Sequence, residues 1–348
     1  MQSSSLMALL LALAMTLMGN TQSQAGEPRP RHHTDQGFQN PWRLPNHDDA
    51  PASVTLPFFL RQVGASIVGN RGIAPKRIAP DHRLIEQVAA EGDYSITWVG
   101  HSTFLVQMAG VRFLTDPTWS NTASPLPIGP RRFVAPGLDL ESIGRIDFVV
   151  ISHNHYDHLD LSTLKTLADG DTPFLVPLAN TETLNRHGIG PLFELDWWES
   201  IQIGDARIDC VPARHWSRRA ITDMNRSLWG GWVVRIGDRA VYFAGDTGMF
   251  PGFVEIGERL GPIDLAMMPI GAYEPRAMME PAHLNPEEAI AAVLATKAVR
   301  SVAMHFGTFE LSEEPLHEPP ERFVRASEAA GRGSEVDWVF KIGETRKF

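Results

Sequence analysis

Short apolar runs recur along the chain from about residue 94 onward, and each is rich in β-branched or aromatic residues. The runs read "SITWVG", "STFLVQMAGVRFLTDP", "DFVVIS", "PFLVP" and "SIQIGDARIDCVPARH", and glycine-containing turns separate them. Runs of this composition are typical of β-strands. The pattern therefore predicts a series of short strands in this part of the chain.

Helical patterns are interleaved with these strands. The stretch "DLSTLKTLADG" begins at a candidate N-cap, Asp160, and ends at Gly170. The stretch "NPEEAIAAVLATKA" has Asn285 as its candidate N-cap, Pro286 in the first turn and Glu288 three residues after the cap. These residues are the ones that satisfy free amides at helix starts. The chain is therefore predicted to be a mixed α/β protein.

Two stretches resemble each other in outline. Both "TFLVQMAGVRFLTDP" and "WVVRIGDRAVYFAGDT" read as strand, tight turn and strand, followed by an aspartate, Asp116 or Asp246. Two similarly built halves would each bring an aspartate to a sheet edge and place a site between them. The alternative is that any two hairpins look alike.

The N-terminus carries an apolar run, Leu6 to Met18, followed by Ser23-Gln24-Ala25, which has the small-x-small form of a cleavage site. We therefore predict a signal peptide over residues 1–26 and an exported protein, periplasmic or associated with the envelope. No Lys or Arg precedes the run, so an uncleaved anchor is the alternative, although the run is shorter than the ~20 residues that span a bilayer.

Residues 27–92 form the predicted N-terminal arm. This segment is rich in Pro, Arg, His and Asp, and only Val54 to Val68 is apolar enough to pack against something. We expect the arm to wrap around the following domain, residues 93–348. Peripheral contact of the apolar piece with a membrane is the alternative.

The amino-acid composition limits which ligands and which kinds of metal site the protein can have. The 348 residues are 43% hydrophobic and carry a formal net charge of -10, which gives no reason to expect nucleic-acid binding. An anionic substrate would then need local arginines. The single cysteine, Cys210, excludes a cysteine-rich zinc site, so a metal must be held by His and carboxylate groups. We expect Cys210 to be a buried strand residue.

The densest cluster of metal-binding side chains is "HNHYDH", directly after the apolar run that ends at Ile151. His153 and His155 are two residues apart, so in extended backbone their side chains point the same way and can bind one metal ion. The following turn carries Asp157 and His158 toward a second ion. One zinc ion needs only three protein ligands. Four donors in such a short stretch therefore indicate a two-metal site rather than a hydrophilic loop.

Further donors follow later apolar runs, at His215, Asp246 and His305. Each one alone is as well explained by a structural role. Taken together they complete two coordination spheres, with Asp246 bridging. The first sphere is His153, His155 and His215, and the second is Asp157, His158 and His305.

The HxHxDH motif with the separated His, Asp and His resembles the metallo-β-lactamase superfamily. The resemblance implies an α/β fold, a four-layer αβ/βα sandwich of two mixed sheets with helices outside and metals at one edge. Longer strings narrow it to the N-acyl-phosphatidylethanolamine-hydrolysing phospholipase D family and its bacterial relatives. These strings are "GHSTFLVQM", "FLTDPTWS", "IGPRRF", "ISHNHYDHLD", "PIGAYEPR", "HLNPEEAI" and "MHFGTFELSEEPLHEPP".

The narrower resemblance implies a metal-dependent phosphodiesterase with two Zn²⁺ per chain, with Fe or Mn as the alternative metal. Its substrate would be a phospholipid, cleaved to phosphatidic acid and an N-acylethanolamine by a hydroxide between the metals. It also implies a homodimer. Asp157, Asp246 and His283 are then the expected catalytic residues, and His283 would bind the phosphate or protonate the leaving alkoxide.

Other side chains have expected roles around the metals. Tyr273, Arg276 and Arg218 are expected to bind the substrate, with surface ion pairs as the alternative for the arginines. Asp116 and His101 are expected to orient ligand residues, with turn capping as the alternative for Asp116. We expect three tryptophans to be core residues rather than an acyl groove, namely Trp216, Trp229 and Trp232.

Three other functions fit the same metal site. The first is hydrolysis of a lactone, or another hydrolysis at the same two-metal site. The second is redox chemistry with iron in the same ligands. The third is a non-catalytic, metal-stabilised lipid-binding protein of the envelope.

Overall fold

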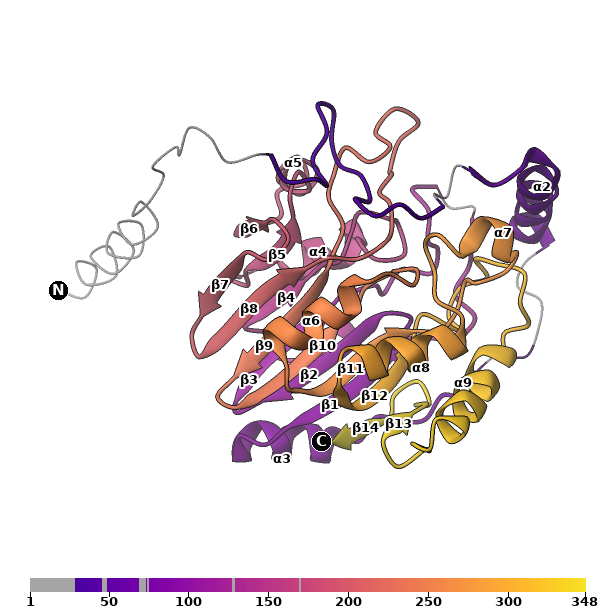
Figure 1. The fold of residues 1–348 in the computed structure, drawn as a ribbon. Coiled ribbons are helices and arrows are strands. Elements are labelled where there is room, and N and C mark those ends of the chain that lie inside the picture. Colours follow the sequence, from indigo (N-terminus) through magenta and orange to yellow (C-terminus); the bar gives the residue numbers. More distant parts are fainter. Residues whose placement is uncertain (1–28, 46–48, 69–72, 74, 127–128, 169) are drawn as a thin grey trace.

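The computed structural model describes residues 29–348, except 46–48, 69–72, 74, 127–128 and 169. Two seven-stranded mixed sheets pack face to face, and the helices lie outside them (Figure 1). This is the α/β sandwich expected from the sequence.

The first sheet has the order β14-β1-β2-β3-β4-β5-β6. The strands from β14 to β3 are antiparallel to their neighbours, and β3 to β6 are parallel. Its strands are β1 (Ser95–Gly100), β2 (Thr103–Met108), β3 (Val111–Thr115), β4 (Phe148–Val150), β5 (Phe174–Pro177), β6 (Leu192–Leu195) and β14 (Thr345–Lys347).

The second sheet has the order β13-β12-β11-β10-β9-β8-β7, with a parallel half from β13 to β10 and an antiparallel half from β10 to β7. Its strands are β7 (Ser200–Ile203), β8 (Ala206–Val211), β9 (Gly231–Ile236), β10 (Arg239–Phe243), β11 (Ile263–Pro269), β12 (Ala298–Met304) and β13 (Asp337–Trp338).

The helices differ in what they cover. Helices α3, α4 and α5 pack on the outer face of the first sheet, α6 and α8 on the second, and α2 lies beside α7 (Figure 1). The helices are α2 (Ala52–Val68), α3 (His82–Glu91), η2 (Leu140–Ser142), α4 (Leu161–Leu167), α5 (Thr181–Asn185), α6 (Gly252–Leu260), α7 (Arg276–Met279), α8 (Pro286–Ala295) and α9 (Glu318–Ala329).

The strands of the first sheet are apolar on both faces because both faces are covered. On β4, Phe148 and Val150 belong to the core between the sheets, whereas Val149 packs beneath the outer helices. Alternate residues of a strand point to opposite faces, so a strand buried on both sides needs an unbroken apolar run. This explains why these runs showed no alternation of polar and apolar residues.

The two similar hairpins of the sequence occupy equivalent places in the two sheets. The β2-β3 hairpin belongs to the first sheet and precedes Asp116, and the β9-β10 hairpin belongs to the second and precedes Asp246. The prediction of two similarly built halves is confirmed.

Both predicted helix caps are present. The Asp160 side chain accepts a hydrogen bond from the Ser162 amide at the start of α4. Asn285 and Glu288 form a reciprocal capping box at the start of α8, with Pro286 in its first turn. Cys210 is fully buried on β8, as expected.

The N-terminal arm is fastened at more places than its composition suggested. Beyond the apolar piece, which forms α2, His32 stacks on Trp197 and Trp42 packs against Phe250. The expectation that only Val54 to Val68 could pack was wrong, because aromatic rings bury large apolar faces even in a polar segment. The predicted signal peptide lies outside the described residues. Within the described ranges, none of the helices is long and apolar enough to cross a membrane.

Replacing Asn285 by Ala should lower the free energy of unfolding by about 1 kcal/mol, because the cap removes one free amide at the start of α8. In the structure Asn285 Oδ1 accepts from the Glu288 amide at 2.8 Å. Urea denaturation measures the change, and Leu294→Ala, on a half-exposed position of the same helix, is the control. An equal loss in both variants would contradict the role of the cap.

Candidate metal centre

The predicted ligands lie where strands of both sheets end. His153 and its neighbours follow β4 of the first sheet, and His215, Asp246 and His305 follow β8, β10 and β12 of the second. These three strands of the second sheet run in the same direction, so their carboxyl ends reach one edge. The structure brings all seven predicted ligand residues together at this edge.

Three imidazoles form the first donor group. Nδ1 of His155 lies 2.8 Å from Nε2 of His153 and 3.3 Å from Nε2 of His215. One ring nitrogen of each histidine lies within 4.8 Å of the other two. These are the three residues predicted for the first metal ion.

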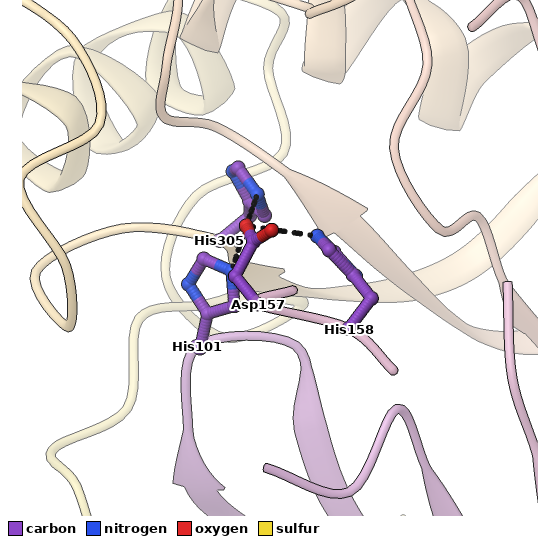
Figure 2. Close-up of side chains that lie close together, drawn as sticks. All are labelled: His101, Asp157, His158 and His305. Carbon is purple, nitrogen blue, oxygen red and sulfur yellow. Dashed lines mark hydrogen bonds and ion pairs between the residues drawn. The ribbon is translucent and has the colours of Figure 1, made fainter. Parts of the chain in front are cut away.

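The second donor group surrounds the Asp157 carboxylate. Oδ2 of Asp157 lies 3.2 Å from Nε2 of His158 and 3.5 Å from Nε2 of His305. Figure 2 shows these imidazoles and that of His101 directed toward the carboxylate. Asp157, His158 and His305 are the residues predicted for the second ion.

Asp246 contacts both groups through one oxygen atom. Its Oδ2 lies 3.0 Å from Nε2 of His305 and 3.2 Å from Nε2 of His158, and 3.9 Å from Nε2 of His215 in the first group. This is the position that a bridging ligand requires. Oδ1 of Asp246 is buried and meets no hydrogen-bond donor among the described residues.

The donor set fits two divalent cations. Imidazole and carboxylate groups are the ligands that zinc takes when no thiolate is present. An unpaired buried carboxylate oxygen costs free energy unless a cation or donor meets it. Oδ1 of Asp246 is such an atom, so the residues present suit the metal ions that the motif predicts.

Neighbouring carboxylate and hydroxyl groups hold the ligand rings in place. Asp116 Oδ2 lies 2.6 Å from Nδ1 of His158 and accepts from the Ser152 hydroxyl, which in turn contacts Nδ1 of His153 at 2.8 Å. His101 Nε2 lies 2.9 Å from Asp157 Oδ2. Asp116 and His101 therefore lie where the predicted orienting roles require them, and Asp116 contacts His158 directly and His153 through Ser152.

The two donor groups differ electrostatically. Burial lowers the pKa of both His153 and His215 well below the usual value, which keeps these rings neutral. Burial also disfavours charge on His305, but Asp246 and hydrogen bonds to both carboxylates outweigh it and raise its pKa to about 9. The carboxylates therefore create a negative site that favours a cation beside it.

The close approach of the two halves constrains the backbone. Gly245, directly before Asp246, has φ of +60°, and a Cβ there would lie 2.6 Å from Cβ of Ser152 and 2.9 Å from the Gly230 carbonyl oxygen. A side chain at this position would collide with both of these atoms, so the backbone before Asp246 could not lie this close to Ser152. His101 and His305 also have left-handed backbone, a conformation that is unfavourable for residues other than glycine.

A cavity of about 790 Å³ opens beside the donor groups. The charged wall contains His155, Asp157, Asp246, His283 and His305. Much of the remaining lining is apolar, and its larger side chains are Phe58, Phe59, Trp216, Ile221, Met224, Met278, Met279 and Leu311. The cavity therefore joins a metal-binding wall to a surface suited to hydrocarbon.

His283 reaches this cavity as predicted. Its Nδ1 lies 3.8 Å from Asp246 Oδ2, and its ring packs edge-on against His215. The Arg276 guanidinium holds the loop, since it donates to the His283 carbonyl oxygen at 3.2 Å and to the Glu288 carboxylate at 2.8 and 3.0 Å.

Two of the predicted substrate-binding residues lie outside the cavity lining. The Tyr273 hydroxyl donates to Glu318 at 2.7 Å, and the Arg276 guanidinium is engaged by Glu288, so neither residue lines the cavity. Their positions therefore do not support the prediction that they bind the substrate, because sequence proximity to His283 does not reveal a carboxylate that takes the charge. Arg218 does line the cavity, with its Nε donating to the Ala220 carbonyl oxygen.

The tryptophans divide between core and cavity. Trp229 and Trp232 are buried, and their indole N–H groups donate to the carbonyl oxygens of Ala213 and Ile151. Trp216 lines the cavity instead. The apolar contributions of Phe58 and Met278 were missed, because only the fold brings α2 to α7.

Replacing Asp116 by Asn should lower metal affinity about 10–100-fold, because the amide cannot accept from His158 as the carboxylate does. Metal content after dialysis against buffered zinc measures the change, and circular dichroism confirms folding. Asp139→Asn, at an exposed carboxylate, is the control. A folded Asp116→Asn protein with unchanged zinc affinity would refute the orienting role.

Comparison with known proteins agrees with this geometry. Residues 111–306 match the family model of the Beta-lactamase superfamily domain. The chain is 35% identical over 298 residues to N-acyl-phosphatidylethanolamine-hydrolyzing phospholipase D 1 of Caenorhabditis elegans, covering 81% of this chain and 84% of that protein. It is 42% identical over 241 residues to an uncharacterized protein of Mycobacterium tuberculosis, covering 67% of this chain and 64% of that one.

Among solved structures, a metallo hydrolase of the hyperthermophilic archaeon Ignicoccus hospitalis superposes with a TM-score of 0.57 at 25% identity. The match covers 73% of this chain and 98% of that structure. The sequence motif, the paired sheets and these relatives agree, and the chain belongs to the metallo-β-lactamase superfamily as a metal-dependent hydrolase related to the N-acyl-phosphatidylethanolamine-hydrolysing phospholipases D.

Proposed function

We propose that the protein is a dizinc phosphodiesterase of phospholipase D type that cleaves N-acyl-phosphatidylethanolamine-like lipids. The products would be phosphatidic acid and an N-acylethanolamine. The observation that carries the proposal is the single cavity lined both by members of the two donor groups, joined by Asp246, and by many apolar side chains. The relative from Caenorhabditis elegans supports the choice of lipid.

Different residues would bind each of the two zinc ions. The first donor group would hold one ion, the second the other, and Asp246 both. When bound, the ions supply a water of lowered pKa and positive charge for the phosphate oxygens. Asp116, Ser152 and His101 keep the ligand rings and the Asp157 carboxylate oriented. This arrangement requires no serine or cysteine nucleophile.

His283 and Arg218 line the cavity outside the two donor groups. His283 would hydrogen-bond a phosphate oxygen or give a proton to the leaving alkoxide, because it lines the cavity and its buried Nδ1 meets no hydrogen-bond partner among the described residues. Arg218 would pair with the phosphate, which needs a local cation in a protein of net charge -10. The apolar lining would take acyl chains.

A phospholipid substrate also requires access from a lipid surface. Leu56 and Leu60 on α2 are 60% and 65% exposed, and Ile221, at the cavity, is 87% exposed. Phe58 of the same helix is buried against Met278 and Met279. Helix α2 thus presents exposed leucines beside the cavity, which supports peripheral contact with a membrane.

Zinc-loaded protein lacking residues 1–26 should convert N-acyl-phosphatidylethanolamine to phosphatidic acid and N-acylethanolamine, identified by mass spectrometry. Asp246→Asn should form neither product, because it weakens the bridge between the donor groups. His283→Ala should lower turnover at least about 100-fold, whereas His187→Ala, at an exposed site, should not.

Three outcomes would redirect the proposal. Cleavage of a simple phosphodiester without cleavage of the lipid would retain the mechanism and reject the substrate. Opening of a lactone alone would favour the other hydrolytic function. Full activity of Asp246→Asn would reject the assignment of the site.

The double variant Leu56→Ser/Leu60→Ser should bind phosphatidylcholine vesicles at least about tenfold more weakly. Full burial of one leucine side chain in an apolar phase contributes roughly 1.5–3 kcal/mol of binding free energy, which serine does not supply. Vesicle flotation measures binding, and turnover of a water-soluble phosphodiester should be unchanged. Leu294→Ser, on a half-exposed leucine of α8, is the matched control. Equal flotation of all three proteins would exclude α2 as the contact.

A further inference from the structure

A second group of metal-binding side chains lies apart from the catalytic donors, between the N-terminal arm and the β6-β7 connection. His32 and His33 are consecutive, and both direct Nε2 at one carboxylate, that of Asp196. Each Nε2 lies 2.7 Å from a different oxygen of Asp196. Asp196 directly follows β6, an edge strand of the first sheet, and precedes β7, an edge strand of the second.

The surrounding aromatic residues fix both imidazoles. His32 stacks on Trp197 with ring centroids 4.3 Å apart, and His33 meets Phe38 edge-on at 5.1 Å. The side chains of His32, His33 and Asp196 are 11%, 21% and 16% exposed. The rings therefore lose little conformational entropy on binding a ligand, and one side of the group still faces solvent.

The Asp196 carboxylate is held in its ionised form. Burial disfavours the charge, but hydrogen bonds from both histidines and from the Trp197 amide outweigh burial and lower the pKa of Asp196. The Trp197 amide donates to Oδ1 at 2.7 Å. An ionised carboxylate between two imidazole nitrogens is a donor set that divalent cations of the zinc type bind.

We propose that His32, His33 and Asp196 bind one divalent cation of the zinc type, separate from the catalytic metals. One ligand atom of each residue lies within 4.8 Å of the other two. Two imidazoles and one carboxylate supply three ligands, and the solvent-facing side leaves room for water as the fourth. The ion would replace the direct histidine–carboxylate hydrogen bonds as the link between the arm and the domain.

The position of this site gives the ion a structural consequence. Beyond His33 the arm runs to the loop that carries a catalytic ligand, where Asn40 Nδ2 donates to the His215 carbonyl oxygen at 2.9 Å. Arg214 donates to the Pro45 carbonyl oxygen at 2.6 Å. An ion bound to His32 and His33 would therefore fix the arm segment whose Asn40 side chain hydrogen-bonds the backbone of His215.

The test is zinc titration of the folded protein that already carries its catalytic metals. Isothermal calorimetry and metal analysis after gel filtration should show one additional zinc per chain. His33→Gln and Asp196→Asn should lose this zinc and keep the catalytic metal content. His187→Ala, an exposed histidine of another loop, is the matched control and should keep both.

Limited proteolysis provides an independent readout. Added zinc should slow cleavage within residues 29–45 of the parent at least several-fold and have no such effect on His33→Gln. Absence of an additional zinc in the parent, or its retention by His33→Gln, would overturn the proposal and leave a purely hydrogen-bonded link. Because His33→Gln keeps the Asp196 carboxylate, it decides the question even if Asp196→Asn fails to fold.

Discussion

The contact that the site depends on is the one made by Oδ2 of Asp246, which lies within 3.9 Å of ligand nitrogens from both donor groups. This atom comes from the second sheet, whereas His158 and Asp157 come from the first. Buried carboxylates are unfavourable unless positive charge or donors surround them. The chemistry of the site therefore requires the two sheets to keep a fixed position relative to each other.

Several features fix the position of one sheet relative to the other. Gly245 allows the backbone before Asp246 to approach Ser152 closely, and Asp116 links both donor groups through Ser152 and His158. The core between the sheets is filled by large buried side chains such as Trp98 and Trp232. A rigid scaffold of this kind holds ligand atoms in place before a metal binds, which is what metal centres in proteins require.

The N-terminal arm adds a second kind of support. It contacts the domain through His32 and Trp42, which lie outside the apolar stretch of the arm, and through Phe58, which lies within it. At one end it braces the backbone near His215, and at the other α2 supplies part of the apolar lining. The arm thus connects the metal-binding edge to the apolar part of the cavity lining.

Features that depend on local spacing could be predicted from the sequence. Close spacing placed His153, His155, Asp157 and His158 at one strand end, and local hydrogen bonding made Asp160 and Asn285 helix caps.

Features that depend on partners distant in sequence became visible only in the folded protein. Glu288 and Glu318 draw Arg276 and Tyr273 away from the cavity, and α7 brings Phe58 to it. Long-range carboxylates and packing faces leave no periodic signal in a sequence, because the residues that meet are set by how the elements pack.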